Sequence, residues 1–432
     1  MNLNRLRFLR LLQTNLIGVS TLFAMQKFYA LIIAIVFVGA SLTNPASGAV
    51  KAGSACTKAG ATSTFSGKKY TCVKTGKLLV WNKGVLISKP SKQPAPATSS
   101  SPSQGAAGST PSSQEPINSK VIELPTSFAN IEERYQGIPY AVWDKIQTNL
   151  ELHKYSELKI SFLFGPNTPQ RYPDQWTINA VTLGSRVMGS QKQPSEIKFI
   201  QFNKDDVSWA RNEANKYTSP FNLGINYADQ ASEKCSGIDC DGAVTNITTD
   251  IGLVLVGVSN PVNRFNIQKF NGQNDLHEYT HAVQGMIFKG KTKVPPSMQM
   301  PCWFAEGQPQ AISIPTLAKS AEDYVRIRKG WITDNRWVLK DYEPETIQAF
   351  LKENMQAPCP SNTYSMLFSL GYIVMDALIA VGGVDKTFDV QVGRADGQTF
   401  EDSFKKVYGI SWEEASIALS KTASKVYKEN KK

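Results

Sequence analysis

The stretch NDLHEYTHAVQG, residues 274–285, contains two of the three histidines in this chain of 432 residues. His277 and His281 are four positions apart, so on a helix they share one face and can point at a single ion. Neutral imidazole nitrogens bind Zn²⁺, and a catalytic zinc site uses three protein ligands and leaves a fourth position open for water. The spacing therefore predicts that these two histidines bind zinc.

Glu278 directly follows the first histidine and lies about 100° from it around the helix, so it does not point at the same ion. Its carboxylate can instead reach a water molecule at the metal, where the general base of a metal-assisted hydrolysis belongs. The alternative is that the histidines lie on an exposed helix and bind nothing.

The third ligand must come from elsewhere in the chain. An extended pattern with a third histidine would need Gly and His where the chain has Gln284 and Ile287. The remaining histidine, His153, lies far upstream in NLELHKYSELK, where a solvated or capping role suits it better. A carboxylate is left as the ligand type, and the stretch PCWFAEGQPQAI supplies Glu306 at the start of a second expected helix.

HEYTH followed by WFAEG resembles the zinc-site signature of the gluzincin metallopeptidases, the thermolysin-like and aminopeptidase N-like clan. The resemblance implies zinc ligands at His277, His281 and Glu306 and a catalytic base at Glu278. The downstream stretch from Phe368 to Ala415 also resembles the segment that follows the site in peptidase MA-like families. The implied function is a secreted zinc peptidase that cleaves a peptide or protein substrate and needs no cofactor beyond zinc.

One position departs from the family pattern. Many relatives have a tyrosine three residues before the glycine of a later helix, where its hydroxyl stabilises the oxyanion; counting back from Gly371, this chain has Phe368. Tyr364 and Tyr372 lie one helical turn to either side and are the candidates to replace it, unless both pack in the core. Loss of an oxyanion donor costs about 10²–10³ in rate. Phe368 therefore favours the alternative function, a non-catalytic envelope-associated binding protein that retains the fold.

Asp275 lies two residues before the first histidine and has two candidate roles. It can cap the N-terminus of the helix that carries the motif, which the residue type favours. The alternative is that its carboxylate accepts the second N–H of a metal-bound histidine.

The first 49 residues have the order of a secretory signal peptide: basic residues, the apolar run ALIIAIVFVGA, then the small residues of NPASGA. The apolar run is shorter than the about 20 residues that a membrane span needs. We expect cleavage after Gly48 or Ala49, with translation beginning at Met1 or Met25; an uncleaved membrane anchor is the alternative. The protein is therefore expected to be secreted or associated with the cell envelope.

The chain contains six cysteines, which in an exported protein indicate disulfides rather than thiols. A zinc ribbon is disfavoured because no CxxC doublet occurs. Proximity gives the first two pairs and elimination the third: Cys56 with Cys72, Cys235 with Cys240, and Cys302 with Cys359. The third pair would tie the Glu306 segment to the start of the helix that contains Tyr364.

Composition divides the remaining chain into three segments. Residues 50–88 alternate apolar and polar types around two cysteines, which predicts a small disulfide-linked β module that binds the cell wall or serves as a spacer. Residues 89–120 consist largely of Pro, Ser, Ala and Gly, which predicts a disordered linker. Residues 121–432 predict one α+β domain, which the resemblance implies is zincin-like, with a mixed sheet before a mainly helical C-terminal part.

Two further features concern partners. The stretch IGLVLVGVS, residues 251–259, predicts a strand just before the histidine motif, either at the sheet edge, where it could pair with a peptide, or in the core. The net charge of +11 indicates attraction to an anionic envelope or to acidic partners. No stretch interleaves aromatics with arginines, so we expect no nucleic-acid partner.

Overall fold

The computed structural model divides into two compact units, residues 1–113 and residues 114–432. The predicted signal peptide and linker lie outside the part of the chain that the structure describes. The described residues are residue 56 and residues 58–65, 68–75, 78–82, 85–86, 122–221, 226–262, 271–334, 339–355 and 366–430.

The first unit contains an antiparallel sheet of short strands, in which β2 pairs with all three others. Cys72 is buried in the middle of β2 and forms the predicted disulfide with Cys56. A short β unit linked by one disulfide is therefore confirmed. Its strands are β1 (Thr62–Phe65), β2 (Lys68–Thr75), β3 (Leu78–Trp81) and β4 (Val85–Leu86).

The second unit is an α+β structure with one mixed sheet in the order β5-β6-β8-β7. The first three strands in this order are parallel, and β7 runs antiparallel at the edge beside β8. Parallel strands covered on both faces read as near-continuous apolar runs, as β8 does with IGLVLVG. The strands are β5 (Lys159–Phe164), β6 (Glu196–Phe202), β7 (Ala243–Ile247) and β8 (Ile251–Gly257).

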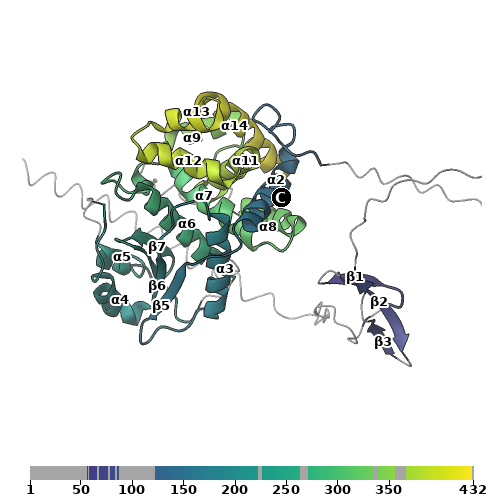
Figure 1. Ribbon diagram of the computed structural model, residues 1–432, viewed down its shortest axis with the longest axis horizontal. Coiled ribbons are helices and arrows are strands. Elements are labelled where there is room, and N and C mark those ends of the chain that lie inside the picture. The colour runs from purple at the N-terminus through teal and green to yellow at the C-terminus, as the bar shows by residue number, and fades with distance from the viewer. Residues whose placement is uncertain are drawn as a thin grey trace, which may run out of the picture. The chain divides into compact units, whose positions relative to one another are not determined.

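The helices of the second unit cover both faces of the sheet and then form a separate helical half (Figure 1). The α-helices are α2 (Ile138–Leu152), α3 (Asp174–Val187), α4 (Val207–Ala214), α5 (Tyr227–Glu233), α6 (Gln273–Phe288), α7 (Cys302–Leu317), α8 (Ala321–Asp334), α9 (Pro344–Glu353), α11 (Tyr372–Gly382), α12 (Val384–Ala395), α13 (Phe400–Tyr408) and α14 (Trp412–Glu429). Short 3₁₀ turns are η1 (Tyr135–Gly137), η2 (Lys204–Asp206) and η4 (Pro296–Met298), and a π-helical turn, η6 (Leu367–Gly371), precedes α11.

The two sheet faces have separate apolar cores because the side chains of β8 alternate between them. Val254 and Val256 belong to the large core that contains α3 and α6, whereas Leu253 and Leu255 pack with α4 and α5. β8 is therefore an internal strand between β6 and β7, and its expected role as an edge strand is wrong. The core alternative is right, and the edge position belongs to β7.

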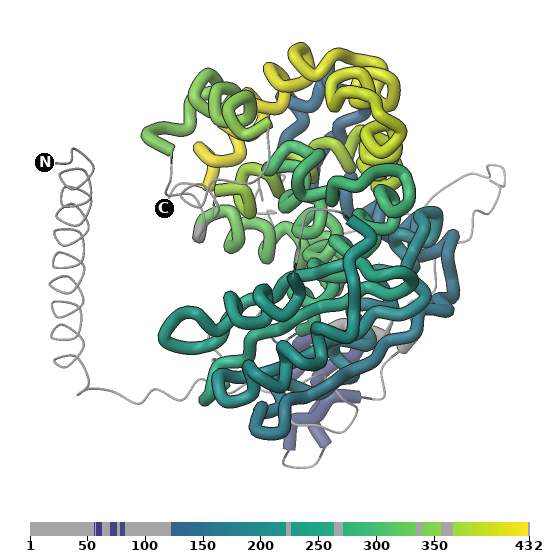
Figure 2. The backbone as a smooth tube through the Cα atoms, turned by 90° about the vertical axis from the view of Figure 1, so that its left-hand side faces the viewer, coloured from purple at the N-terminus to yellow at the C-terminus, as the bar shows by residue number. Residues whose placement is uncertain are grey.

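α7 joins the sheet half to the helical half, because it packs against α6 on one side and against η6 and α11 on the other (Figure 2). The contact with η6 is close: a Cβ added to Gly307 would lie 2.4 Å from the backbone of Gly371. The WFAEG glycine thus allows α7 and η6 to touch through their backbones.

Within the described residues, no single helix has both the length and the apolar character to cross a membrane. One pair bent by 106°, Leu367–Gly382 with Val384–Ala395, passes the same test together. Most side chains of α11 in that pair are buried in the core.

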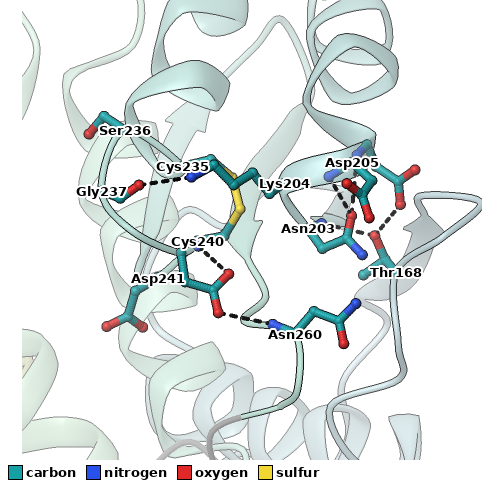
Figure 3. Close-up of a disulfide and its surroundings, with 12 residues drawn as sticks. Thr168, Asn203, Lys204, Asp205, Cys235, Ser236, Gly237, Cys240, Asp241 and Asn260 are labelled. Carbon is teal, nitrogen blue, oxygen red and sulfur yellow. Dashed lines mark hydrogen bonds between the residues drawn. A yellow bond between two sulfur atoms is a disulfide. The ribbon is translucent and has the colours of Figure 1, made fainter.

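Two disulfides on the described residues match the predicted pairs, Cys56–Cys72 and Cys235–Cys240. Cys302 is also disulfide-bonded, whereas its predicted partner Cys359 lies outside the described residues. Figure 3 shows the second disulfide, whose loop is held by Lys204 through Nζ hydrogen bonds to the carbonyl oxygens of Gly237 and Ile238 at 3.2 and 3.1 Å. Disulfides indicate that the protein folds in an oxidising environment, as found outside the cell.

Candidate metal centre

The two motif histidines lie side by side on α6, a helix that is buried on nearly all sides. Their Nε2 atoms are 3.1 Å apart, and their rings are nearly perpendicular, at 77°. His277 is 6% exposed, and the side chain of His281 is 21% exposed, so His281 lies nearer the opening of the site. The structure thus places both imidazoles with one nitrogen each directed at the same point.

Glu306 reaches that point from the second turn of α7. Its Oε2 lies 3.6 Å from the Nε2 atom of each histidine. These three residues form a group of metal-ligating atoms within 4.8 Å of one another. Ligand atoms at about 2.0–2.2 Å from a tetrahedral zinc ion lie about 3.3–3.6 Å from one another. The spacing and the donor set of two imidazoles and one carboxylate therefore fit Zn²⁺.

Charge in this site follows from burial and from the short distances. Burial disfavours the charged forms of His281 and Glu306, but the attraction between their opposite charges is larger than this effect in both residues. Burial lowers the pKa of His281, yet the Glu306 carboxylate raises it to about 9. Burial raises the pKa of Glu306, yet the two imidazoles, His281 first, hold it well below its usual value. Glu306 is therefore ionised, which is the form that binds a cation.

Glu278 does not belong to the group of three, and its carboxylate contacts the edge strand beside them. The hydroxyl of Thr245 on β7 lies 2.7 Å from Glu278 Oε2 and 3.0 Å from the Glu278 carbonyl oxygen. The Glu278 side chain is nearly buried, but it still lines the cleft beside the histidines. Thr245 has no motif around it, so the sequence offered no signal for this contact.

The cleft in front of the three ligands has a volume of about 450 Å³. One wall is the edge strand β7, all five residues of which line the cleft. Other lining residues include Phe221, Tyr227, Gln230, Lys234, Pro295, Pro296, Trp331 and Phe368. The cleft thus has the edge strand β7 on one side and the group of His277, His281 and Glu306 beside it.

Phe368 lies at the cleft, with its ring centroid 5.8 Å from that of His277. Tyr364 lies outside the described residues. Tyr372 is fully buried outside the cleft lining, and its hydroxyl donates to the Tyr324 hydroxyl at 3.2 Å. Within the described lining the only tyrosine is Tyr227, whose hydroxyl donates to a backbone carbonyl at 2.9 Å.

Asp275 has a structural role that differs from both expectations. The N-cap of α6 is Gly272, in a left-handed conformation with φ 82°, so the expected N-cap role of Asp275 is wrong. Asp275 is fully buried, pairs with Arg171 at 3.0 Å and accepts hydrogen bonds from Tyr172 and Thr177. These bonds attach α6 to α3 and leave neither histidine oriented by this carboxylate.

The second nitrogens of the two histidines have different surroundings. His281 Nδ1 lies 2.8 Å from Gln284 Oε1, whereas His277 Nδ1 is buried without a hydrogen-bond partner among the described residues. His153 is remote from both. It is the C-cap residue of α2, with its Nδ1 3.2 Å from the Asn149 carbonyl oxygen, in agreement with its expected capping role.

Comparisons of the chain with family models, with curated proteins and with solved structures find no match in any of the three.

Proposed function

We propose that the protein is a secreted zinc-dependent peptidase with a gluzincin-type site on a zincin-like fold. The observation that carries the proposal is the convergence of His277, His281 and Glu306 at the spacing of a three-ligand zinc site, with Glu278 beside them in an open cleft. Three protein ligands suit catalysis, whereas structural zinc sites use four.

In this mechanism the three ligands hold zinc, which when bound polarises the scissile carbonyl and acidifies a water molecule. Glu278 takes the proton from the attacking water and delivers it to the leaving amine. The Thr245 hydroxyl keeps the carboxylate directed into the cleft. The edge strand β7 pairs with an extended substrate by β-augmentation and orients its peptide bond towards the ligands.

Replacement of Glu278 by Gln tests the proposal because it removes the base while keeping the size of the side chain. We expect Glu278→Gln to bind zinc like the wild type and to cleave casein or peptides about 10²–10⁴ times more slowly. The control is Glu151→Gln, which changes an exposed carboxylate at the end of α2 and should leave cleavage unchanged. A wild type without zinc, or a Glu278→Gln variant with full activity, would contradict the proposal.

A second candidate function is a non-catalytic, envelope-associated binding protein. Phe368 favours it, because no tyrosine in the described cleft lining has its hydroxyl directed at the ligands. In that case purified wild type and Glu278→Gln would both contain zinc, and neither would cleave any peptide in a random library.

A further inference from the structure

Gln284 follows His281 by one helical turn on α6 and is 3% exposed. Its Oε1 lies 2.8 Å from His281 Nδ1. Its Nε2 donates to the Ala305 carbonyl oxygen at 3.2 Å and to Gln308 Oε1 at 2.8 Å. One buried amide thus contacts a zinc ligand on α6 and the backbone next to Glu306 on α7.

Two backbone carbonyls determine which way these hydrogen bonds run, because a carbonyl oxygen can only accept. The Ala305 carbonyl requires the NH₂ group of Gln284 on its side, which leaves Gln284 Oε1 facing His281.

The second carbonyl is that of Val384, which accepts a hydrogen bond from Thr387 at the other end of this series of hydrogen bonds. The Thr387 hydroxyl donates its one proton to this carbonyl at 2.6 Å, so its oxygen must accept from Gln308 Nε2 at 2.7 Å. Gln308 then presents Oε1 to the Gln284 NH₂ group. The Ala305 and Val384 carbonyls therefore agree that Gln308 donates to Thr387 and that Gln284 donates to Gln308.

We propose that Gln284, Gln308 and Thr387 form a positioning relay that fixes the His281 tautomer. Since Gln284 Oε1 can only accept, His281 Nδ1 must carry a proton, and the lone pair of the neutral ring lies on Nε2. That atom faces Glu306 and His277. Because Nδ1–H stays bonded to Gln284, Nε2 is the nitrogen that gives up its proton when a metal binds, and the Ala305 bond fixes the backbone next to Glu306 at the same time. The inference rests on the proposed zinc site.

The tautomer can be measured in the metal-free protein by ¹⁵N NMR of the imidazole nitrogens, since the chain has only three histidines. Spectra are recorded at about pH 10.5, because the pKa of His281 is raised to about 9. We expect Nδ1–H in the wild type and loss of this single tautomer in Gln284→Leu. Zinc affinity should fall about 10–100-fold in Gln284→Leu. Gln284→Glu keeps the acceptor for Nδ1–H but loses the NH₂ group that donates to Ala305 and Gln308, so it should retain the tautomer and lose less zinc affinity than Gln284→Leu.

Gln391 provides the matched control. It is a fully buried amide that donates to Gln308 Oε1, but the direction of the relay does not depend on it. Its own Oε1 has no partner in the described part of the chain. Gln391→Leu should therefore keep zinc affinity within about twofold of wild type, whereas a general packing effect would weaken binding in both leucine variants.

Thr387→Val keeps the relay testable if Gln284→Leu fails to fold, since it removes only the distant hydroxyl and should still weaken zinc binding. An Nε2–H tautomer in the wild type, or equal zinc affinity in wild type, Gln284→Leu and Thr387→Val, would overturn the relay. A wild type with the Nδ1–H tautomer that binds no zinc would support the relay and reject the peptidase proposal.

Discussion

At the scale of single residues, Thr245 connects the edge strand to the proposed base. Its hydroxyl is 2.7 Å from Glu278 Oε2 and 3.0 Å from the Glu278 carbonyl oxygen, so both of these hydrogen bonds go to the proposed base. We expect Thr245→Val to keep the zinc content and KM and to lower kcat about tenfold, because the carboxylate is free to turn away from the attacking water. Steady-state kinetics with parallel metal analysis measure both quantities.

Thr248 offers a control for that change, since it lies just after β7 and its hydroxyl bonds the Ile251 carbonyl oxygen at 3.3 Å. Thr248→Val removes a buried hydroxyl of the same size outside the cleft lining and should leave kcat unchanged. Equal kcat in wild type and Thr245→Val, or equal losses in both variants, would show that the Thr245 hydroxyl does not position Glu278.

Residue types and spacing predicted the components of the site but not what orients them. His277 and His281 could be paired because the helical repeat brings positions four apart together. Glu306 could be added by elimination, and the structure brings it to 3.6 Å from both. Gln284 and Thr245 could not be found in this way, because their roles depend on contacts between elements. Asp275 was misread because sequence cannot show that its partners come from α3 and the loop before it.

At the scale of elements, α7, which carries Glu306, lies close against η6 because Gly307 has no side chain. A Cβ at Gly307 would lie 2.4 Å from the Gly371 carbonyl, so Gly307→Ala must push α7 away from η6. We expect this variant to unfold at lower urea concentration, with a loss of about 1–3 kcal/mol, and to bind zinc more weakly. Urea unfolding and zinc titration measure these effects.

Gly330 on α8 is the control glycine, because a Cβ there would meet no atom within 4 Å. Gly330→Ala should stabilise the protein by about 0.5–1 kcal/mol, since alanine favours the helix. A Gly307→Ala variant as stable as wild type would mean that the close approach of α7 and η6 is not needed to place Glu306.

Element types were easier to predict than element order. The apolar run of β8 was correctly read as a strand, yet composition did not decide between edge and core. The order depends on the crossover that inserts β8 between β6 and β7. The edge strand β7 has the sequence AVTNI, which is neither long nor strongly alternating, and it follows the Cys235–Cys240 loop. The sequence does not show that Thr245 on this strand contacts Glu278, because that contact depends on how β7 packs against α6.

At the scale of the whole molecule, the proposed zinc ligands come from α6 in the sheet half and from α7, which joins the sheet half to the helical half (Figure 2). His277 and His281 belong to the helix under the sheet, and Glu306 belongs to the helix that contacts η6 and α11. Bound zinc would therefore join the two halves of the second unit. This arrangement links the metal site to the stability of that unit as a whole.

Removal of the metal should consequently lower the melting temperature of the protein. A ligand at about 1,000 times its Kd stabilises the folded state by about 4 kcal/mol, which for a unit of this size corresponds to on the order of 10 °C. The shift should grow from pH 6 to pH 9, because zinc must displace a proton from His281, whose pKa is about 9 without metal. Calorimetry with zinc or with a chelator measures it. Glu278→Gln should keep the full shift and His281→Ala should lose it; equal melting temperatures with and without zinc in the wild type would contradict a metal shared by α6 and α7.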